Sequence, residues 1–214
     1  MLKDGVRTDK DFLKKFLVST FFTMAVVLVT VLRFIFIDEL GKSMPSAYGF
    51  YIGFGVGLAA LCVGMLLLLY SVMDFGELKL KEQSAILFTV FFSYVISTYI
   101  SLASIYLMPV FLAGLILSQL SQKQYVFVAN TMVCIFVGYT ELINFVVVGE
   151  NAISLLVVIA AGLVCGGISA ITLSGDGSRL RFFVKSFIVC AFSLLTTLFF
   201  YVVKVPSVKE SLMY

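Results

Sequence analysis

Long apolar runs separated by short polar segments make up almost the whole chain. A helix of about 20 apolar residues crosses the hydrocarbon core of a bilayer, which is about 30 Å thick. The predicted spans are 16–37, 48–73, 84–101, 104–121, 124–148, 152–173 and 182–203. These runs lack the alternation over about ten residues that is typical of the strands of a membrane β-barrel. The pattern therefore predicts an all-α integral membrane protein, a polytopic bundle of about seven transmembrane helices.

Residues 83–122 form one stretch of forty positions without a charged side chain. A single helix of that length would be about 60 Å long at about 1.5 Å per residue, which is twice the hydrocarbon thickness. The middle of the stretch, SYVISTYISLASIY, is its most polar part and contains three tyrosines. Tyrosine is enriched at the level of the lipid headgroups. We therefore expect two spans joined by a hairpin.

The positive charges give an independent test of the hairpin, because lysine and arginine are concentrated in cytoplasmic loops. With two crossings, eleven of them lie inside: Lys3, Arg7, Lys10, Lys14, Lys15, Lys79, Lys81, Lys123, Arg179, Arg181 and Lys185. Three lie outside, Lys42, Lys204 and Lys209, and Arg33 falls within a span. With one crossing the count becomes nine inside against five outside. The charges favour two crossings and an N-in/C-out topology.

The composition supports a membrane protein and excludes several kinds of site. The chain of 214 residues is 61% hydrophobic and 13% charged, with a mean hydropathy of +1.11. Its cysteines, Cys62, Cys134, Cys165 and Cys190, lie in apolar runs without a CxxC pair, and it has no histidine. Such cysteines act as small apolar residues. We therefore expect no metal site, cofactor, disulfide or nucleic-acid partner.

The two ends of the chain differ from the spans. Residues 1–15 are basic and polar and precede a long apolar run that no small-residue cleavage site closes. We interpret them as a cytoplasmic N-terminus followed by a retained signal-anchor helix rather than a cleaved signal peptide. Residues 204–214 form a short tail that offers no anchoring or targeting motif, which favours an interrupted chain.

Glycines repeat at four-residue spacing in two of the predicted spans. Gly49, Gly53 and Gly57 share one face of the second span, and Gly162 and Gly166 share one face of the sixth. Small residues at this spacing allow the backbones of two membrane helices to approach closely. We expect both faces to pack against other helices, either within one molecule or between two copies.

Pro109 lies about two turns into the fourth predicted span. Proline removes a backbone hydrogen-bond donor, so we expect a kink at this position. The kink serves either to accommodate packing, which membrane helices allow through local adjustment, or as a hinge that faces a ligand.

Ionisable residues inside a span are costly and therefore mark candidate functional sites. Arg33 lies about four residues from the outer end of span one, and Glu141 about seven from the outer end of span five. Their similar depth predicts an ion pair, to which Asn144, one turn above Glu141, adds an amide. This cluster is our candidate site for sensing a ligand or signal. The alternatives are a purely structural pair, or two charges that reach separately to the outer headgroups.

The loop SGDGSRLRF at 174–182 is a glycine-rich turn followed by Arg179 and Arg181, and Lys185 begins the next span. This cytoplasmic basic loop either follows the general positive-inside pattern or binds anionic lipid or a cytosolic partner. The sequence contains no nucleophile–base pair, metal cluster or phosphate-binding loop. We therefore expect no catalytic residue and no enzyme activity.

Two long segments resemble the membrane core of the seven-transmembrane HD-hydrolase receptors. They are SIYLMPVFLAGLILSQLSQKQYVFVANTMVCIFVGY and ISLLVVIAAGLVCGGISAITLSGDGSRLRFFVKSFIVCA. The resemblance covers roughly residues 48–200 and depends on the rhythm of hydropathy and on Tyr106, Pro109, Gly162, Arg179 and Arg181. It implies a membrane sensor that works with a cytosolic phosphohydrolase acting on a cyclic dinucleotide.

The chain departs from that family in three respects. Only the ten residues DELGKSMPSA separate the first two spans, where the family has a large extracytoplasmic domain. The chain ends after the seventh predicted span, and it has no histidine for an HD metal site. No catalytic residue of the family is therefore carried over to this sequence.

Two functions from different classes remain open. The first is a non-catalytic sensory or regulatory membrane domain of a signalling receptor, which communicates with a cytosolic signalling enzyme. We expect such a domain to be a multi-pass protein of the cell membrane, in a bacterium the inner membrane. The second is the substrate-binding membrane subunit of a small-molecule transporter of the energy-coupling-factor type, which would require a coupling subunit. A third option is a scaffold that only assembles helices through its glycine faces. The sequence leaves the ligand and the oligomeric state open.

Overall fold

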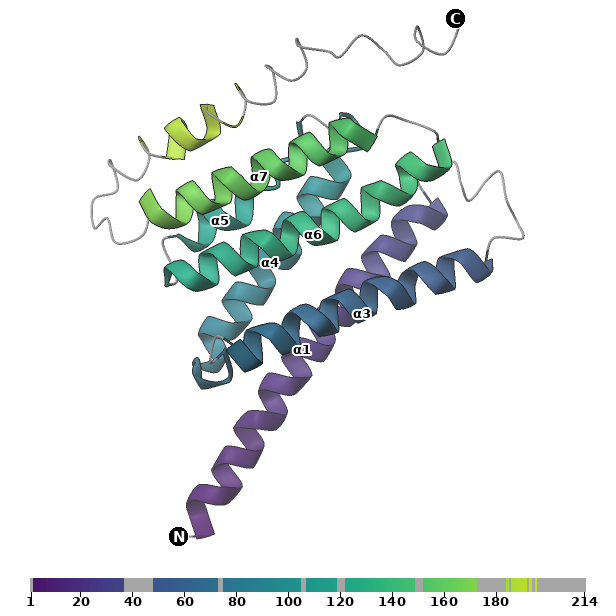
Figure 1. The fold of residues 1–214 in the computed structure, drawn as a ribbon. Helices are drawn as coiled ribbons and strands as arrows, with labels where there is room; N and C mark the ends of the chain where they lie inside the picture. Colours follow the sequence, from purple (N-terminus) through teal and green to yellow (C-terminus); the bar gives the residue numbers. More distant parts are fainter. Residues whose placement is uncertain are drawn as a thin grey trace, which may run out of the picture.

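The computed structural model describes residues 2–36, 48–72, 75–104, 107–118, 122–148 and 152–172, together with 184, 186–191, 193 and 195. Every regular element in these ranges is helical, which confirms the all-α fold class (Figure 1). The elements are α1 (Leu2–Phe36), α3 (Tyr48–Val72), the 3-10 turn η1 (Phe75–Glu77), α4 (Leu80–Ile100), α5 (Leu112–Leu117), α6 (Lys123–Val148) and α7 (Ala152–Thr172).

Four of these helices are long and apolar enough to cross a membrane, which identifies a membrane-embedded protein. The apolar segments are Asp11–Ile35 in α1, Ile52–Ser71 in α3, Leu80–Ile100 in α4 and Lys123–Leu142 in α6. A shorter apolar segment, Leu155–Ile171, lies in α7. Large apolar side chains are also exposed on the outside of the bundle, among them Phe21 at 74% and Phe88 at 67%. Such a surface is compatible with contact to lipid chains.

Side-chain contacts show that α1, α4 and α6 run in the same direction. Lys15 of α1 lies beside Gly76, just before α4, and Phe75 packs on Tyr125 near the start of α6. At the opposite end, Arg33 of α1 and Ser101 after α4 both contact Glu141 of α6. Helices α3 and α7 run in the opposite direction to these three, and α5 runs parallel to α7, because Val110 lies at Gly162 and Gly114 at Gly166.

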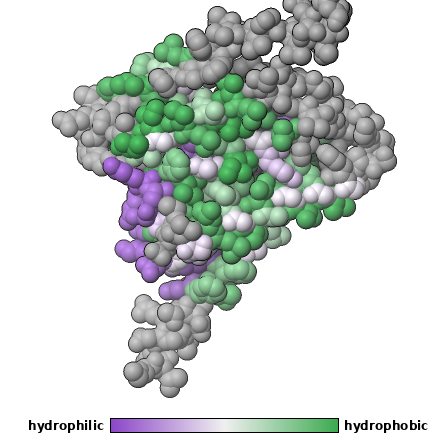
Figure 2. All heavy atoms as spheres, in the orientation of Figure 1, coloured by the Kyte–Doolittle hydropathy of each residue, from purple (hydrophilic) through white to green (hydrophobic). Residues whose placement is uncertain are grey.

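The two ends of the bundle differ in polarity. One end, here called the lysine end, carries Lys14, Lys15, Lys79, Lys81 and Lys123 where α1 enters the bundle and α4 and α6 begin. Figure 2 shows the hydrophilic residues of this end gathered at the left of the view, while apolar residues cover most of the remaining surface that is drawn in colour. The other end, here called the ion-pair end, contains Arg33 and Glu141.

The forty-residue uncharged stretch is broken in its polar middle, as predicted. Helix α4 ends at Ile100, and a turn follows in which the N–H of Ala103 donates to the carbonyl of Ile100 at 3.0 Å. Because α4 and α6 are parallel, the chain must then return to the lysine end before α6 begins. From Tyr125 to Glu141 this distance is about 24 Å along α6.

The returning segment is not the continuous helix predicted over 104–121. Only α5, six residues long, is helical, and the described residues from Ser104 to Phe111 run as turns and irregular backbone. Pro109 precedes α5 instead of kinking it, and its carbonyl accepts the N–H of Leu112 at 2.9 Å. The prediction of a kinked helix is wrong here, because proline supplies no N–H and disfavours helical backbone at Met108, the residue before it.

The remaining sequence predictions concern the two ends of the chain and the basic loop. The sequence predicts a polar N-terminal segment 1–15 before the first span, but helix α1 includes residues 2–15 and extends past the other helices at the lysine end (Figure 1). Of the predicted span 182–203, the described residues 184, 186–191, 193 and 195 are helical. The basic loop with Arg179, Arg181 and Lys185, and the tail 204–214, lie outside the described residues.

Candidate functional site

The structure brings Arg33 and Glu141 together as a buried, two-pronged ion pair. The Nη1 atom of Arg33 donates to Oε1 of Glu141 at 2.6 Å, and Nη2 donates to Oε2 at 3.3 Å. Ser101 donates its hydroxyl to the same Oε1 atom at 2.6 Å. One carboxylate therefore joins three segments that are far apart in the sequence: α1, the end of α4, and α6.

The burial of this pair excludes one of the alternatives left by the sequence, that the two charges reach separately to the headgroups. Arg33 is 2% exposed and the Glu141 side chain 6%, so neither charge reaches separately to the headgroups. A paired arginine and glutamate with extra hydrogen bonds is the arrangement that makes buried charge tolerable. Removing one partner of such a pair costs about 3–5 kcal/mol, because the other charge stays buried. The backbone of Asn144 belongs to α6, and its side chain lies outside the described residues.

One helical turn from the ion pair, three hydroxyl groups form a buried cluster. The hydroxyl of Tyr94 on α4 lies within hydrogen-bonding distance of Thr30 on α1, and at 2.9 Å from Oγ1 of Thr140 on α6. The two threonines also donate to carbonyls of their own helices, at 2.7 and 2.9 Å. Three protons therefore serve four contacts, and at any moment Tyr94 donates to only one of the two threonines.

Aromatic rings fill the space beside the ion pair between α1, α3 and α6. Phe34 meets Phe54 edge to face at 4.9 Å between ring centroids, and Phe54 stacks on Tyr139 at 4.8 Å. A side chain added at Gly57 would overlap the hydroxyl of Tyr139, so this glycine of the second span does allow close packing within the molecule. Around Gly49 and Gly53, no described atom lies within 4 Å of an added Cβ.

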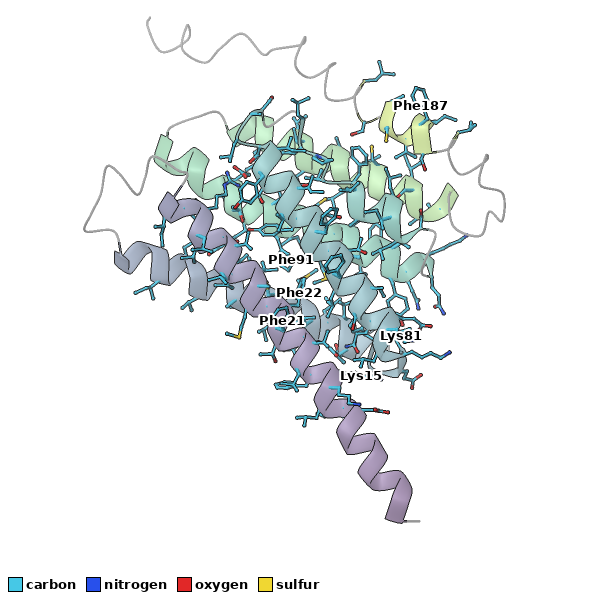
Figure 3. All side chains as sticks on the ribbon, turned by 180° about the vertical axis from the view of Figure 1, so that it is seen from behind. Lys15, Phe21, Phe22, Lys81, Phe91 and Phe187 are labelled. Atoms are coloured by element: carbon cyan, nitrogen blue, oxygen red, sulfur yellow. The ribbon has the colours of Figure 1, made fainter. Side chains whose placement is uncertain are left out.

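A second polar cluster fixes α1 at the lysine end. The ammonium of Lys15 donates to the carbonyl of Gly76 at 2.5 Å, and Ser19 lies 3.1 Å from the hydroxyl of Tyr70. The amide of Gln83 on α4 donates to the same Tyr70 hydroxyl. Figure 3 shows Lys15 and Lys81 at the same end of the molecule, where α1 passes the start of α4. This cluster could not be predicted from the sequence, because each of its residues alone is ordinary near a membrane surface.

A third polar contact, at Asn130, holds α5, α6 and α7 together. The Nδ2 atom of Asn130 donates to the carbonyl of Gly162 at 3.1 Å, and its Oδ1 atom accepts the N–H of Gly114 at 3.3 Å. An added Cβ at Gly166 would overlap the Asn130 amide, and one at Gly162 would overlap Val110. The glycines of the sixth span therefore form a close contact within the molecule, and the asparagine is what they approach.

The three polar clusters consist of one ion pair, a lysine, hydroxyl groups and amides. Among the described residues, no group of three or more His, Cys, Asp or Glu side chains is placed to hold a metal ion. The charged pair and the neighbouring hydroxyls connect helices and offer donors and acceptors, while the surrounding side chains are apolar. Arg33, Thr30, Tyr94, Ser101, Thr140 and Glu141 together are called the α1–α4–α6 cluster below.

Comparison of the chain with protein-family models, with curated proteins and with solved structures finds no match. The function proposed below therefore depends on the geometry of this chain and on the sequence resemblance described above.

Proposed function

We propose that this chain is a non-catalytic sensory or regulatory membrane domain that controls a cytosolic signalling enzyme through the position of α1. The observation that carries the proposal is the buried Arg33–Glu141 pair, which attaches α1 to α6 within the membrane. Ionisable residues at membrane depth are rare, because each is costly, and they mark functional sites by default. The pair is the contact that a stimulus would strengthen or break.

The arrangement of α1 supports its role as the moving element. It is attached by polar side chains at both ends of the bundle, through Lys15 and Ser19 at one and Arg33 at the other. Between these attachments its buried side chains are apolar or hydroxylated, including Phe22, Val26 and Thr30. Hydrogen bonds across membrane helices contribute only about 0.6 kcal/mol on average, so the ion pair is the attachment whose loss would most displace α1.

The output surface follows from the same helix. The N-terminal part of α1 extends beyond the other helices at the lysine end (Figure 1). Lysine-rich ends of membrane helices face the cytoplasm, which supports a cytoplasmic N-terminus; the seven crossings and the C-out end are part of the same proposal. The helix would then reach a cytosolic partner together with the segments 74–83 and 122–124. The resemblance to seven-transmembrane HD-hydrolase receptors suggests that this cytosolic partner degrades a cyclic dinucleotide. It also suggests that the chain itself lies in the inner membrane of a bacterium.

Purification of the tagged chain from the membranes in which it is naturally made tests the proposal. We expect a cytosolic enzyme of cyclic-nucleotide metabolism to be recovered with it. Recovery of an ATPase and a membrane coupling protein would instead support the transport alternative and end the sensory proposal. A chain that is recovered with neither would also contradict the proposal.

A distance measurement tests the role of α1 itself. Spin labels at Lys14→Cys on α1 and Lys123→Cys on α6 lie on exposed side chains, so labelling leaves the core intact. We expect Glu141→Gln to shift or broaden the distance between the labels, and the exchange of both charges (Arg33→Glu with Glu141→Arg) to restore it. An unchanged distance in Glu141→Gln, or no recovery in the exchanged pair, would remove the support for α1 as the output.

A further inference from the structure

Helix α4 carries a row of serines at four-residue spacing, Ser93, Ser97 and Ser101. Residues four apart lie on the same side of a helix, and they are separated by about 6 Å along its axis. The last of the three, Ser101, donates its hydroxyl to Glu141 at 2.6 Å. The row therefore leads from the ion pair back into the buried part of α4 over about 12 Å.

Ser93 and Ser97 are both 0% exposed, and neither oxygen has a hydrogen-bond partner among the described residues. Ser186 also has a buried hydroxyl without such a partner, but it lies outside this row. In contrast, Thr98 and Ser169 donate to a carbonyl of their own helix, at 2.9 and 2.7 Å. Buried polar atoms almost always have a partner in protein or ordered water. The two hydroxyl oxygens of Ser93 and Ser97 lie one turn apart on the row that ends at the Glu141 carboxylate. Their position indicates that a small polar ligand bonds to them.

We propose that Ser93 and Ser97 bind ordered water, so that α4 carries a hydrated row that leads to Glu141. Two hydrogen bonds of about 2.8 Å in sequence span almost the 6 Å between successive serines. One water between each pair of serines therefore has a hydroxyl on either side. Buried waters make about three such bonds.

The charges around the row favour an uncharged ligand. Helices α3, α5 and α7 contain no charged residue. On the membrane-buried parts of α1 and α6 the nearby charges are Arg33 and Glu141, which neutralise each other. A cation or an anion at the serines would therefore lack an opposite charge, whereas water needs only the hydroxyls. A small polar solute would use the same bonds, and it is distinguished from water by the second test below.

This inference deepens the proposed function, and only its role in signalling depends on that proposal. Water at Ser97 and Ser101 offers alternative partners to the Glu141 carboxylate. Arg33 and Glu141 can then separate without leaving either charge buried and without a hydrogen-bond partner. A contact that a stimulus forms and breaks requires such a low cost of separation. The bound water itself is testable without any knowledge of the partner enzyme.

The sign of a melting-temperature shift gives the first test. If water bonds these hydroxyls, Ser93→Ala and Ser97→Ala each lose a satisfied hydrogen bond, and the melting temperature in detergent falls by about 2–4 °C. If the hydroxyls have no partner, removing them raises the melting temperature, because a buried unsatisfied group is costly. The matched control is Ser169→Ala, whose hydroxyl bonds its own helix. An unchanged or raised value for Ser93→Ala and Ser97→Ala would overturn the proposal.

Hydroxyl-radical footprinting provides the second test, because X-rays generate radicals from water wherever water is bound. Tyr94 is 1% exposed and follows Ser93 directly, while Phe75 is a comparable buried aromatic residue away from the row. In the purified chain, with no added solute, we expect Tyr94 to be oxidised at least several-fold faster than Phe75, and this excess to disappear in Ser93→Ala with Ser97→Ala. Equal rates, or an excess that survives the double substitution, would overturn the proposal even if the melting temperatures shift as expected.

Discussion

The contact between Gly166 and Asn130 makes a sharp prediction about the stability of the bundle. In Gly166→Ala the new methyl group would overlap the Asn130 amide, so one of the two must shift. Either Asn130 rotates away, or α7 moves away from α6. We therefore expect Gly166→Ala to destabilise the folded protein, although alanine favours helix over glycine by about 1 kcal/mol.

The magnitude follows from the contacts that each response would lose. Rotation of Asn130 breaks its bonds to Gly162 and Gly114, each worth about 0.6 kcal/mol within a membrane, and leaves the buried amide without partners at a cost of about 1–3 kcal/mol. A shift of α7 costs about 1–3 kcal/mol of packing. After subtraction of the helix propensity, the free energy of unfolding falls by about 2 kcal/mol.

The assay is unfolding in mixed micelles by titration with a denaturing detergent, together with thermal melting. A loss of about 2 kcal/mol corresponds to a fall of roughly 4–8 °C in melting temperature for a chain of this size. Gly64→Ala is the matched control, because it lies in the middle of a membrane helix with no described atom within 4 Å of the added Cβ. We expect this control to melt at the wild-type temperature or slightly above it.

A double substitution identifies the cause. In an Asn130→Ala background the amide is gone, so Gly166→Ala should cost almost nothing beyond Asn130→Ala alone. If Gly166→Ala is as stable as Gly64→Ala, or if its cost is unchanged in the Asn130→Ala background, the close contact at Asn130 does not stabilise the bundle and the reasoning is refuted.

Three further substitutions test the α1–α4–α6 cluster and its surroundings by the same unfolding assay. Glu141→Gln leaves Arg33 buried without its counter-charge and should lower the free energy of unfolding by about 3 kcal/mol. Replacing both residues with leucine should recover most of this lost stability. A cost below about 1 kcal/mol for Glu141→Gln would contradict the buried pair. Tyr94→Phe removes one proton from a cluster whose threonines already bond their own helices, so we expect a loss of no more than about 1 kcal/mol, and a loss above about 2 would mean that the hydroxyls act as a tighter unit. Gly57→Ala meets only the outer end of the Tyr139 side chain, whereas Gly166→Ala meets a hydrogen-bonded amide, so Gly57→Ala should cost less. An equal or larger cost would show that the Tyr139 ring, which stacks on Phe54, cannot move.

Most helix boundaries could be predicted from the sequence because hydropathy alone determines them. The predicted 48–73 became Tyr48–Val72, and the predicted 124–148 became Lys123–Val148. The juxtaposition of Arg33 and Glu141 was also accessible, since two opposite charges at equal depth in apolar surroundings have few other partners. The extent of α1 was not, because residues 2–15 are polar enough to resemble a loop.

The returning segment after α4 could not be predicted by the same argument. Hydropathy reports how apolar a segment is, and the stretch 104–111, whose described residues are irregular, is as apolar as a lipid-facing helix. A usable signal was present in Pro109, which disfavours helix at the residue before it, and in Gly114, which lies against Asn130 and Gly166. Which helices would meet at Asn130 was beyond the sequence, because a lone asparagine in a span carries no information about its neighbours.

The broken segment from Ser104 to Ser118 has a consequence for how the protein is made. Helix α5 is about 9 Å long, less than a third of the hydrocarbon thickness, and irregular backbone that faced lipid would have amide groups that lipid cannot satisfy. This segment therefore cannot enter the bilayer as an independent unit alongside α4. It has to wait until α6 and α7 have been inserted and can offer Asn130 and the glycine face of α7 as a place to dock. Biogenesis thus has an obligatory order, and between the insertion of α4 and that of α7 the nascent chain holds an incomplete crossing that only its own later helices can complete.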